Sequence, residues 1–272
     1  MAARSTVRRK GANVTRRVIL TSLFLAAVVV AQPEQPAPAK PPARGGGYKP
    51  PEGPAPKTPW GKPDLNGVWQ RPYVPDVTSD RGQKGSGPLP FTEWGKAQWD
   101  NYHPDVDGDY TGACLPFGHM RAMGSPDPIQ FMLTDKYMSL LYEQNSWFKV
   151  FPVDGRPHPD KEPSWFGDSV GHWEGDTLVV DTNNFNGLTK LDTVGHPHSD
   201  QLHLIEKFTR TDAGHMAYEV TVEDPKTYTR PWKNSRVFTL RTDWEILEYS
   251  CEENNKGLIE GRIKVPNYDK KQ

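Results

Sequence analysis

Apolar and polar residues alternate along most of the chain after residue 64, and this period of two is typical of β-strands with one buried face. The clearest run begins at Met216, where every second residue through Val222 is apolar. The residues between them, on the other face of the same strand, are mostly polar. One face of this strand is therefore expected to pack or line a cavity, while the other meets water. Similar runs predict strands at 66–71, 137–143, 148–153, 178–181, 203–209, 217–223, 237–241 and 246–251.

The connections between these runs are short and contain few helix signals. Residues 174–176 (Glu-Gly-Asp) form a predicted hairpin turn, with the glycine at the position that needs a positive φ. The best helix candidate is 91–100, where Thr92 is a suitable N-cap. The sequence therefore predicts an all-β fold, an antiparallel up-and-down meander that closes into a barrel with little helix.

The start of this domain resembles the Gly-x-Trp entrance of lipocalin-like barrels in Gly67, Val68 and Trp69. In those barrels the tryptophan closes one end of the barrel. The resemblance implies the same place for Trp69 and a lipocalin-like barrel for the whole domain.

The N-terminal segment looks like a targeting signal. Residues 1–31 contain six basic and no acidic residues, and the apolar run at 18–31 is too short for a membrane span, which needs about 20 residues. We expect a signal peptide at 1–31, cleaved after Ala31, and a mature protein in the periplasm or outside the cell. An uncleaved membrane anchor is the alternative.

The rest of the chain divides by composition. Residues 32–63 contain eleven prolines and predict a disordered linker, 64–265 a single β-barrel-like domain, and 266–272 a flexible tail. With 35% hydrophobic and 11% aromatic residues, the chain has enough apolar material for a core and is neither a coiled coil nor fully disordered.

Charge and cysteine content narrow the function further. Six of the 33 basic residues lie in 1–31, so the remaining chain has an acidic excess and no broad basic field for nucleic acid. We also expect no integral membrane domain after signal cleavage. Cys114 and Cys251 are the only cysteines, and a disulfide between them suits an oxidising compartment. Two separate buried thiols are the alternative.

Three blocks of sequence go together: GHWEGDTLVVDT at 171–182, GHPHSDQLH at 195–203 and CEEN at 251–254. In combination they resemble a large family of uncharacterised, secreted, β-rich bacterial proteins. The resemblance implies export and a β-rich domain, and it supplies no activity.

The second block holds the densest candidate chemistry, with three histidines and one aspartate within eight residues. An aspartate can fix the tautomer of an imidazole and raise its basicity. We therefore expect His198 and Asp200 to pair as general base and orienting group, with His203 beside them. Two alternatives stay open: a zinc site of His196, His198 and His203, and a purely structural polar loop.

Five further residues are candidates for binding a substrate at the barrel mouth: Arg156, His158, Trp165, Tyr142 and Trp232. No nucleotide-binding or haem motif is present, so no cofactor is expected. The leading hypothesis is acid–base chemistry of the lyase, isomerase, hydratase or hydrolase type on a small organic or carbohydrate-derived substrate. A non-catalytic protein that binds a small apolar or carbohydrate ligand is the alternative, and a structural envelope protein is the third.

Overall fold

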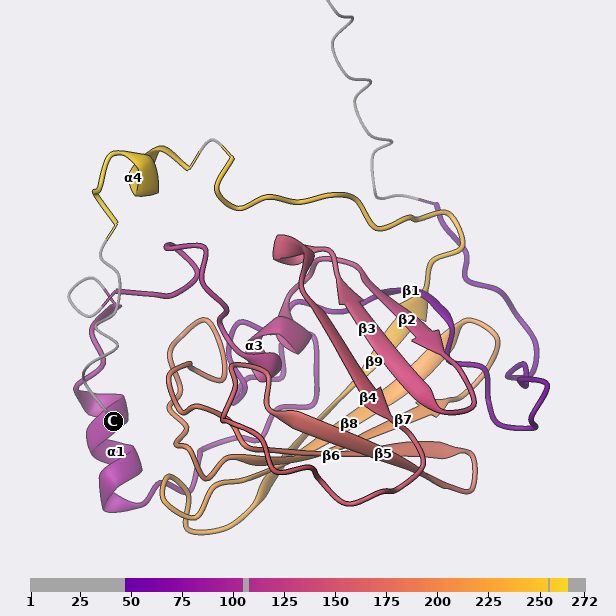
Figure 1. Cartoon of the computed structure of the whole chain (residues 1–272), viewed down its shortest axis with the longest axis horizontal. Coiled ribbons are helices and arrows are strands. Elements are labelled where there is room, and N and C mark those ends of the chain that lie inside the picture. Colours follow the sequence, from indigo (N-terminus) through magenta and orange to yellow (C-terminus); the bar gives the residue numbers. More distant parts are fainter. Residues whose placement is uncertain (1–46, 105–107, 254, 264–272) are drawn as a thin grey trace, which may run out of the picture. The chain divides into compact units, whose positions relative to one another are not determined.

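The computed structural model describes residues 47–104, 108–253 and 255–263, all within the unit 44–272 (Figure 1). The predicted signal peptide at 1–31, residues 32–46 of the predicted linker and the predicted tail at 266–272 lie outside these residues.

Nine antiparallel strands form one sheet, so the prediction of an all-β up-and-down fold is confirmed. The strands are β1 (Gly67–Gln70), β2 (Ile129–Leu133), β3 (Tyr137–Tyr142), β4 (Phe148–Pro152), β5 (Asp168–Glu174), β6 (Thr177–Asn183), β7 (His203–Arg210), β8 (His215–Glu223) and β9 (Trp232–Leu240). Their order is β4-β3-β2-β1-β9-β8-β7-β6-β5, in which every neighbour is consecutive in sequence except β1 and β9. The two ends of the sheet, β4 and β5, lie beside each other and nearly close the barrel (Figure 1).

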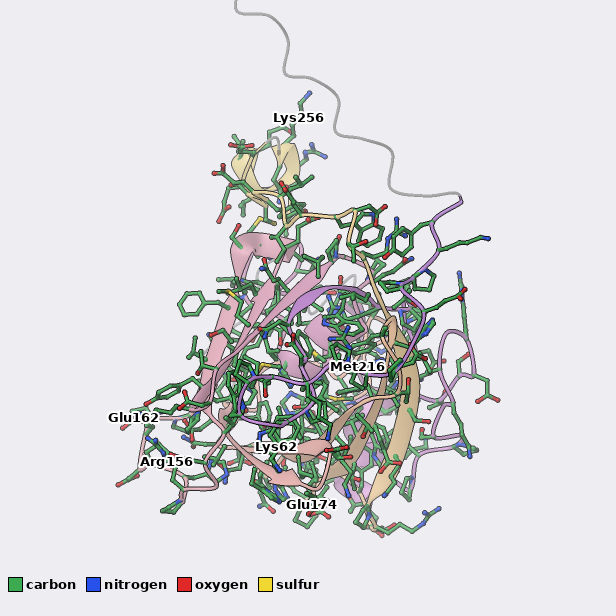
Figure 2. The ribbon with its side chains drawn as sticks, turned by 90° about the vertical axis from the view of Figure 1, so that its right-hand side faces the viewer. Lys62, Arg156, Glu162, Glu174, Met216 and Lys256 are labelled. Atoms are coloured by element: carbon green, nitrogen blue, oxygen red, sulfur yellow. A yellow bond between two sulfur atoms is a disulfide. The ribbon has the colours of Figure 1, made fainter. Side chains whose placement is uncertain are left out.

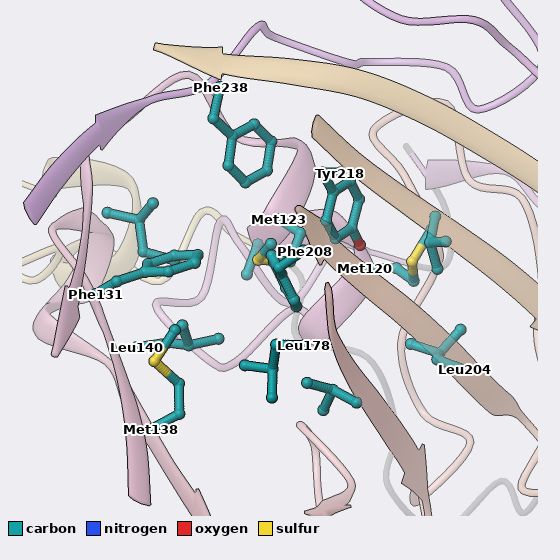
Figure 3. Close-up of a cluster of buried hydrophobic side chains, with 14 of the residues drawn as sticks. Met120, Met123, Phe131, Met138, Leu140, Leu178, Leu204, Phe208, Tyr218 and Phe238 are labelled. Atoms are coloured by element: carbon teal, nitrogen blue, oxygen red, sulfur yellow. The ribbon is translucent and has the colours of Figure 1, made fainter. Parts of the chain in front are cut away.

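The alternation predicted the inner face correctly. On β8, Met216, Tyr218, Val220 and Val222 are all buried. Figure 3 shows the core in which aromatic and aliphatic side chains from several strands meet. Trp69 is fully buried, its indole N–H donates to the carbonyl of Leu65, and the guanidinium of Arg210 lies 5.3 Å from its ring centroid.

The structure corrects the predicted elements in several places. β5 was expected only as the first arm of the hairpin turn at 174–176, and it begins at Asp168. The run at 246–251 is not a strand, because the extended chain there has no neighbouring strand to pair with. β2 was not predicted, since apolar Met132 on its outer face hides the alternation. β9 begins at Trp232, five residues earlier than predicted, because polar residues occupy both of its faces there.

The helices of the described chain are short. Helix α1 (Glu93–Asp100) begins where predicted, and the Thr92 hydroxyl accepts a 3.0 Å hydrogen bond from the amide of Gly95. Helix α3 (His119–Gly124) was not predicted and is mostly buried. The other helices in the described ranges are a 3-10 turn, η1 (Gln144–Ser146), and α4 (Lys256–Ile259).

Residues 48–63, which belong to the predicted linker, contact the barrel at several points. The hydroxyl of Tyr48 donates to the carbonyl of Leu240 at 2.9 Å, and the carbonyl of Gly53 accepts from the amide of Ala213 at 2.9 Å. The part of the linker that the structure describes is therefore packed against the barrel rather than separate from it.

Cys114 and Cys251 form the predicted disulfide, with their Cα atoms 5.5 Å apart. The bond joins the segment before α3 to the segment after β9, not to a last strand. Within the described ranges, no helix has the length and apolar character that crossing a membrane requires.

Candidate functional site

The predicted pair of His198 and Asp200 is not formed. Both ring nitrogens of buried His198 have other partners: Nδ1 donates to the carbonyl of Ser199 at 2.9 Å, and Nε2 accepts from the hydroxyl of Thr189 at 2.7 Å. Burial lowers the pKa of His198 to about 4, so the imidazole is neutral at pH 7. The Asp200 carboxylate is exposed and lies 3.7 Å from the ammonium of Lys226. The pairing hypothesis is wrong because the loop buries one residue and exposes the other.

His196 lies in a third environment. Its ring stacks on Trp99 at a centroid distance of 4.2 Å, and its Nδ1 lies 2.6 Å from Oδ2 of Asp192 and 3.9 Å from Oδ1 of Asp76. Among the described residues, Asp76, Asp192 and His196 form the one group whose donor atoms are close enough together for a metal ion. Asp192 already accepts from three backbone amides, those of Val77, Gly195 and His196 itself. The group therefore holds a turn together, and the alternative zinc site with His198 and His203 is not assembled.

His203 lies on the outer face of the barrel, between two carboxylates. Its Nε2 is 2.8 Å from Oδ2 of Asp181 on β6, and its Nδ1 is 3.0 Å from Oε2 of Glu223 on β8. The strand register produces this contact, because His203 is directly opposite Glu223, while Asp181 is paired with Ile205 and so lies diagonal to His203. Such diagonal neighbours are within reach of long side chains.

The loop after β4 extends this row of side chains. His158 places Nε2 at 2.9 Å from Oδ1 of Asp181 and Nδ1 at 3.1 Å from Oδ2 of Asp168. Asp168 in turn accepts from Lys161 at 2.7 Å. We call this row the outer His–carboxylate chain; its members are Lys161, Asp168, His158, Asp181, His203 and Glu223.

The loop that carries His158 is fixed to the sheet. The amide of Gly155 donates to the carbonyl of Gly171 at 2.9 Å. Val170 and Val179 point to the outer face but are buried. Packing of the loop over this part of the sheet explains their burial. His158 and His203 themselves remain partly exposed, at 23% and 30% of their side chains, so small molecules can reach them.

Within the outer His–carboxylate chain, hydrogen bonds and opposite charges shift the pKa values of His203 and Asp168. Partial burial alone would lower the pKa of His203, but hydrogen bonds to Asp181 and Glu223 and their negative charges together raise it above its usual value. Burial would likewise raise the pKa of Asp168, and the hydrogen bonds and charges of Lys161 and His158 outweigh it and lower that pKa. Each nitrogen of His203 faces an acceptor, a geometry that suits the imidazolium with two N–H donors.

Of the predicted substrate-binding residues, only His158 lies beside His203. Arg156 is exposed on the same loop, where it forms an ion pair with Asp154 at 2.6 Å (Figure 2). Trp165 packs its ring edge against Tyr110 at a centroid distance of 5.0 Å. The other two lie in the interior: Trp232 packs on Tyr228, and Tyr142 belongs to a buried polar network.

This buried network was not predicted. The Nε2 of His119 on α3 lies 2.8 Å from Oε2 of Glu206, whose Oε1 accepts from the hydroxyl of Tyr218 at 2.8 Å. The hydroxyl of Tyr142 lies 3.1 Å from Nδ1 of His119. Burial lowers the pKa of His119, so the neutral ring donates to Glu206 from Nε2 and accepts from Tyr142 at Nδ1. Burial opposes ionisation of Glu206, but the interaction with His119, the charge of Lys149 and the Tyr218 hydroxyl lower its pKa.

Three buried cations lie around this network, and two of them, Lys149 and Arg236, interact with the Glu206 carboxylate. Lys149 donates to the carbonyl of Phe166 at 2.9 Å, and Arg71 donates to the carbonyls of Ala122 and Asp127. Burial lowers the pKa of Lys149 to about 8 and that of Arg71 to about 10, and both remain charged at pH 7. The third cation, Arg236, lies over the ring of Tyr218 with its guanidinium carbon 4.8 Å from the centroid.

The alternation of inward and outward residues along the strands contains a sequence signal for this network. Glu206 occupies an inward position of β7 between Leu204 and Phe208, and Arg236 occupies an inward position of β9 before Phe238. A charged residue on the apolar face of an alternating strand is a candidate for a buried polar site.

A groove of about 630 Å³ lies on another part of the outer face, along β5–β9 and residues 82–84. No histidine lines it. Its charged lining residues are Lys84, Glu174, Lys207, Glu219 and Arg236. Lys207 lies 3.5 Å from Glu174, and Glu219 lies 3.2 Å from Lys233. It is separate from the outer His–carboxylate chain, and we assign it no function.

Comparison with known protein families, with curated proteins and with solved structures gives no match. The resemblance to secreted β-rich bacterial proteins therefore stays a prediction, and the function has to be argued from the residues.

Proposed function

We propose that this protein is an enzyme that performs acid–base chemistry on the outer face of its barrel, with His203 as the reacting group and Asp181 and His158 as the residues that position it. The observation that carries the proposal is the bridge in which one carboxylate, Asp181, lies 2.9 Å from one imidazole and 2.8 Å from the other. Proton transfer requires donor and acceptor within hydrogen-bond reach, and every link of the chain meets this condition.

His203 supplies the general acid. Its raised pKa keeps a proton on the ring near neutral pH, where a general acid is most effective. For that transfer a substrate oxygen takes the place of Glu223 at Nδ1–H and accepts its proton, while Nε2–H stays hydrogen-bonded to Asp181, which orients the ring. The proton then returns to Nδ1 from the protonated product or from water. His158, on the other side of Asp181, holds that carboxylate in place.

The reaction class follows from the groups present. Paired imidazoles and carboxylates serve hydrolysis, hydration, elimination and isomerisation, which need proton transfer at a carbon or oxygen atom. A small organic or carbohydrate-derived substrate suits this site, since the chain lies open on the surface of the sheet rather than in a deep cleft.

The test is a substrate panel of esters, lactones, hydroxy acids and glycosides, assayed with the wild-type protein and with His203→Gln. We expect a loss of roughly two to four orders of magnitude in kcat on removal of the general acid. The matched control is His172→Gln, because His172 also lies on the outer face of this sheet, is 46% exposed and places its Nε2 3.3 Å from a neighbouring glutamate, Glu174. The control should keep full activity.

Two results would refute the proposal. One is an absence of turnover with every member of the panel. The other is turnover that His203→Gln and His172→Gln affect equally, because a general acid cannot be replaced by glutamine.

We also propose that the protein is exported to the periplasm or beyond. The basic segment followed by a short apolar run at 18–31 supports a signal peptide, and the Cys114–Cys251 disulfide is typical of proteins in oxidising compartments.

A further inference from the structure

The outer face of β2, β3 and β4 exposes large apolar side chains. These three strands are neighbours at one end of the sheet (Figure 1). Phe148 and Val150 on β4 are 70% and 55% exposed, and Met132 on β2 and Tyr137 on β3 are exposed as well. None of the outward side chains of these three strands carries a charge. A single exposed apolar residue is ordinary, whereas a contiguous set of them marks an interaction surface.

The strand register makes these residues one continuous surface. Ser139 is opposite Met132 on one side and Val150 on the other, so the three residues form a row across the strands. Leu141 and Phe148 are opposite each other in the next row. Side chains in one row are close enough to touch, because neighbouring strands are about 4.8 Å apart. We call this surface the apolar outer face; its members are Met132, Tyr137, Ser139, Leu141, Phe148 and Val150.

The outer surface of the barrel is different on β7 and β8. Their outward residues include His203, Lys207, Glu219 and Glu223, all of which form ion pairs on the surface of the sheet. Solvation alone gives no reason for charged residues on these strands and apolar residues on β2–β4. A partner that covers the apolar outer face does give a reason, because removal of apolar surface from water is favourable.

The exposed apolar area is close to what a dimer requires. The four exposed apolar residues of the face present roughly 500 Å² to solvent, near the upper limit for a monomeric protein. The segment 246–250 is attached to the turn between β3 and β4, where the amide of Leu247 donates to Glu143 at 3.0 Å and the hydroxyl of Ser146 donates to the carbonyl of Tyr249 at 3.1 Å. Leu247 and Tyr249 are exposed and enlarge the apolar surface at that end to roughly 700 Å². A stable interface buries about 800 Å² on each partner, including its polar rim.

We propose that the apolar outer face binds the same face of a second copy of this chain, so that the protein is a two-fold symmetric dimer. A two-fold contact places a surface against itself, and the surface must therefore be compatible with its own copy. The uncharged centre meets this condition, because no like charges come to lie opposite each other. The rim carries both signs: Asp135 and Lys136 are adjacent between β2 and β3, and Arg156, which lies 5.8 Å from the ring centroid of Tyr137, is paired with Asp154.

A lipid surface is the other candidate occupant, and the charges argue against it. Proteins that insert apolar side chains into a membrane surface use lysine and arginine to bind anionic headgroups. The chain after residue 31 has an acidic excess, and the rim of the apolar outer face holds acidic residues beside its basic ones. These charges suit a second copy better than an anionic bilayer.

The test is sedimentation equilibrium of the full chain over a range of concentrations. We expect the wild type to have the mass of two chains. Val150→Lys should raise the dissociation constant of the dimer at least about 100-fold, because a two-fold interface contains the substitution twice. The matched control is Val237→Lys, since Val237 is an outward valine on β9 with a similar exposure of 54%. The control should dimerise as the wild type does.

A second variant and a measurement of folding complete the test. Phe148→Ser introduces no charge and should raise the dissociation constant at least about tenfold, so the proposal stays testable if Val150→Lys does not fold. Circular dichroism of both variants should match that of the wild type, because both residues are exposed.

Three results would overturn the proposal. The first is a wild type that is monomeric at every concentration, whether or not deletion of residues 32–46 then allows it to dimerise. The second is a dimer that Val150→Lys, Phe148→Ser and Val237→Lys affect equally. The third is a monomer that binds vesicles of phosphatidylcholine and phosphatidylglycerol and loses this binding in Val150→Lys. The apolar outer face does not contain His203, so His203→Gln should dimerise normally and a failure of the enzymatic proposal leaves this result unchanged.

Discussion

Replacement of Glu206 by glutamine tests whether the buried network holds the barrel together. The carboxylate accepts hydrogen bonds from His119 and Tyr218, both at 2.8 Å, and its negative charge raises the pKa values of buried Lys149 and Arg236 against the effect of burial. Glutamine has nearly the same shape but no charge, and one of its two polar ends is a donor. That end would face an N–H or O–H donor, so one of the two hydrogen bonds is lost as well.

The expected cost follows from these contacts. A hydrogen bond to a charged group contributes about 1.5–3 kcal/mol, and removal of one partner from a buried charged group costs about 3–5 kcal/mol. Glutamine retains one acceptor, so we expect the free energy of unfolding to fall by about 3–5 kcal/mol. For a folded unit of some 200 residues this corresponds to a drop of about 6–20 °C in melting temperature.

Urea unfolding and calorimetry at pH 7 measure this difference. The control is Glu219→Gln on β8, where the carboxylate is 41% exposed and pairs with Lys233, and we expect a change below about 1 kcal/mol. The wild type should also lose stability in acid. Because the pKa values of Glu206 and His119 are lowered by folding, their contribution is present above the unfolded values and is lost as the pH falls through the folded ones. A Glu206→Gln protein within 1 kcal/mol of the wild type would contradict the reasoning.

Three further outcomes are expected. Joint replacement of Cys114 and Cys251 by serine should lower the free energy of unfolding by up to about 5 kcal/mol in the chain-entropy model for a separation of 137 residues, measured by urea unfolding; equal stability would show that the crosslink does not restrict the unfolded chain. The pKa of His203, followed by NMR, should lie above 6.5 and fall in Asp181→Asn, so that its stabilising contribution is complete below 6.5 and is lost as the pH rises through the folded value; an unchanged pKa in the variant would exclude the ion pair as its cause. N-terminal sequencing of the exported protein should show cleavage after Ala31, and an intact N-terminus on exported protein would exclude it.

The fold was largely predictable because the alternation of buried and exposed residues along a strand depends only on local sequence. Met216 and Tyr218 were assigned to the inner face from their spacing alone, and both are fully buried. The same rule failed at 246–251, because an alternating segment becomes a strand only when another strand is available to pair with it. The pattern of one segment contains no information about that partner.

The functional residues were less predictable, because sequence density is a poor guide to position on a turn. His196, His198 and Asp200 are close in sequence, yet they contact three different parts of the structure. The contact that joins His203 to His158 passes through Asp181 and depends on the register of β6 and β7 and on the fold of the loop after β4. Neither the strand register nor the fold of this loop can be deduced from the spacing of residues along the chain.

The outer His–carboxylate chain and the buried network around Glu206 are separated by the alternation of side chains along a single strand. His203 and Glu206 are three residues apart on β7, so their side chains leave the strand on opposite faces, one toward solvent and one into the barrel. A proton taken up by His203 is therefore not shared with Glu206 through any hydrogen bond between them, and each face can be altered without loss of contacts on the other. His203→Gln should leave the interior unchanged, and Glu206→Gln should leave the pKa of His203 unchanged as long as the barrel stays folded. A shift in the His203 pKa in folded Glu206→Gln would mean that the sheet transmits charge between its faces, and the two sites would then have to be treated as one.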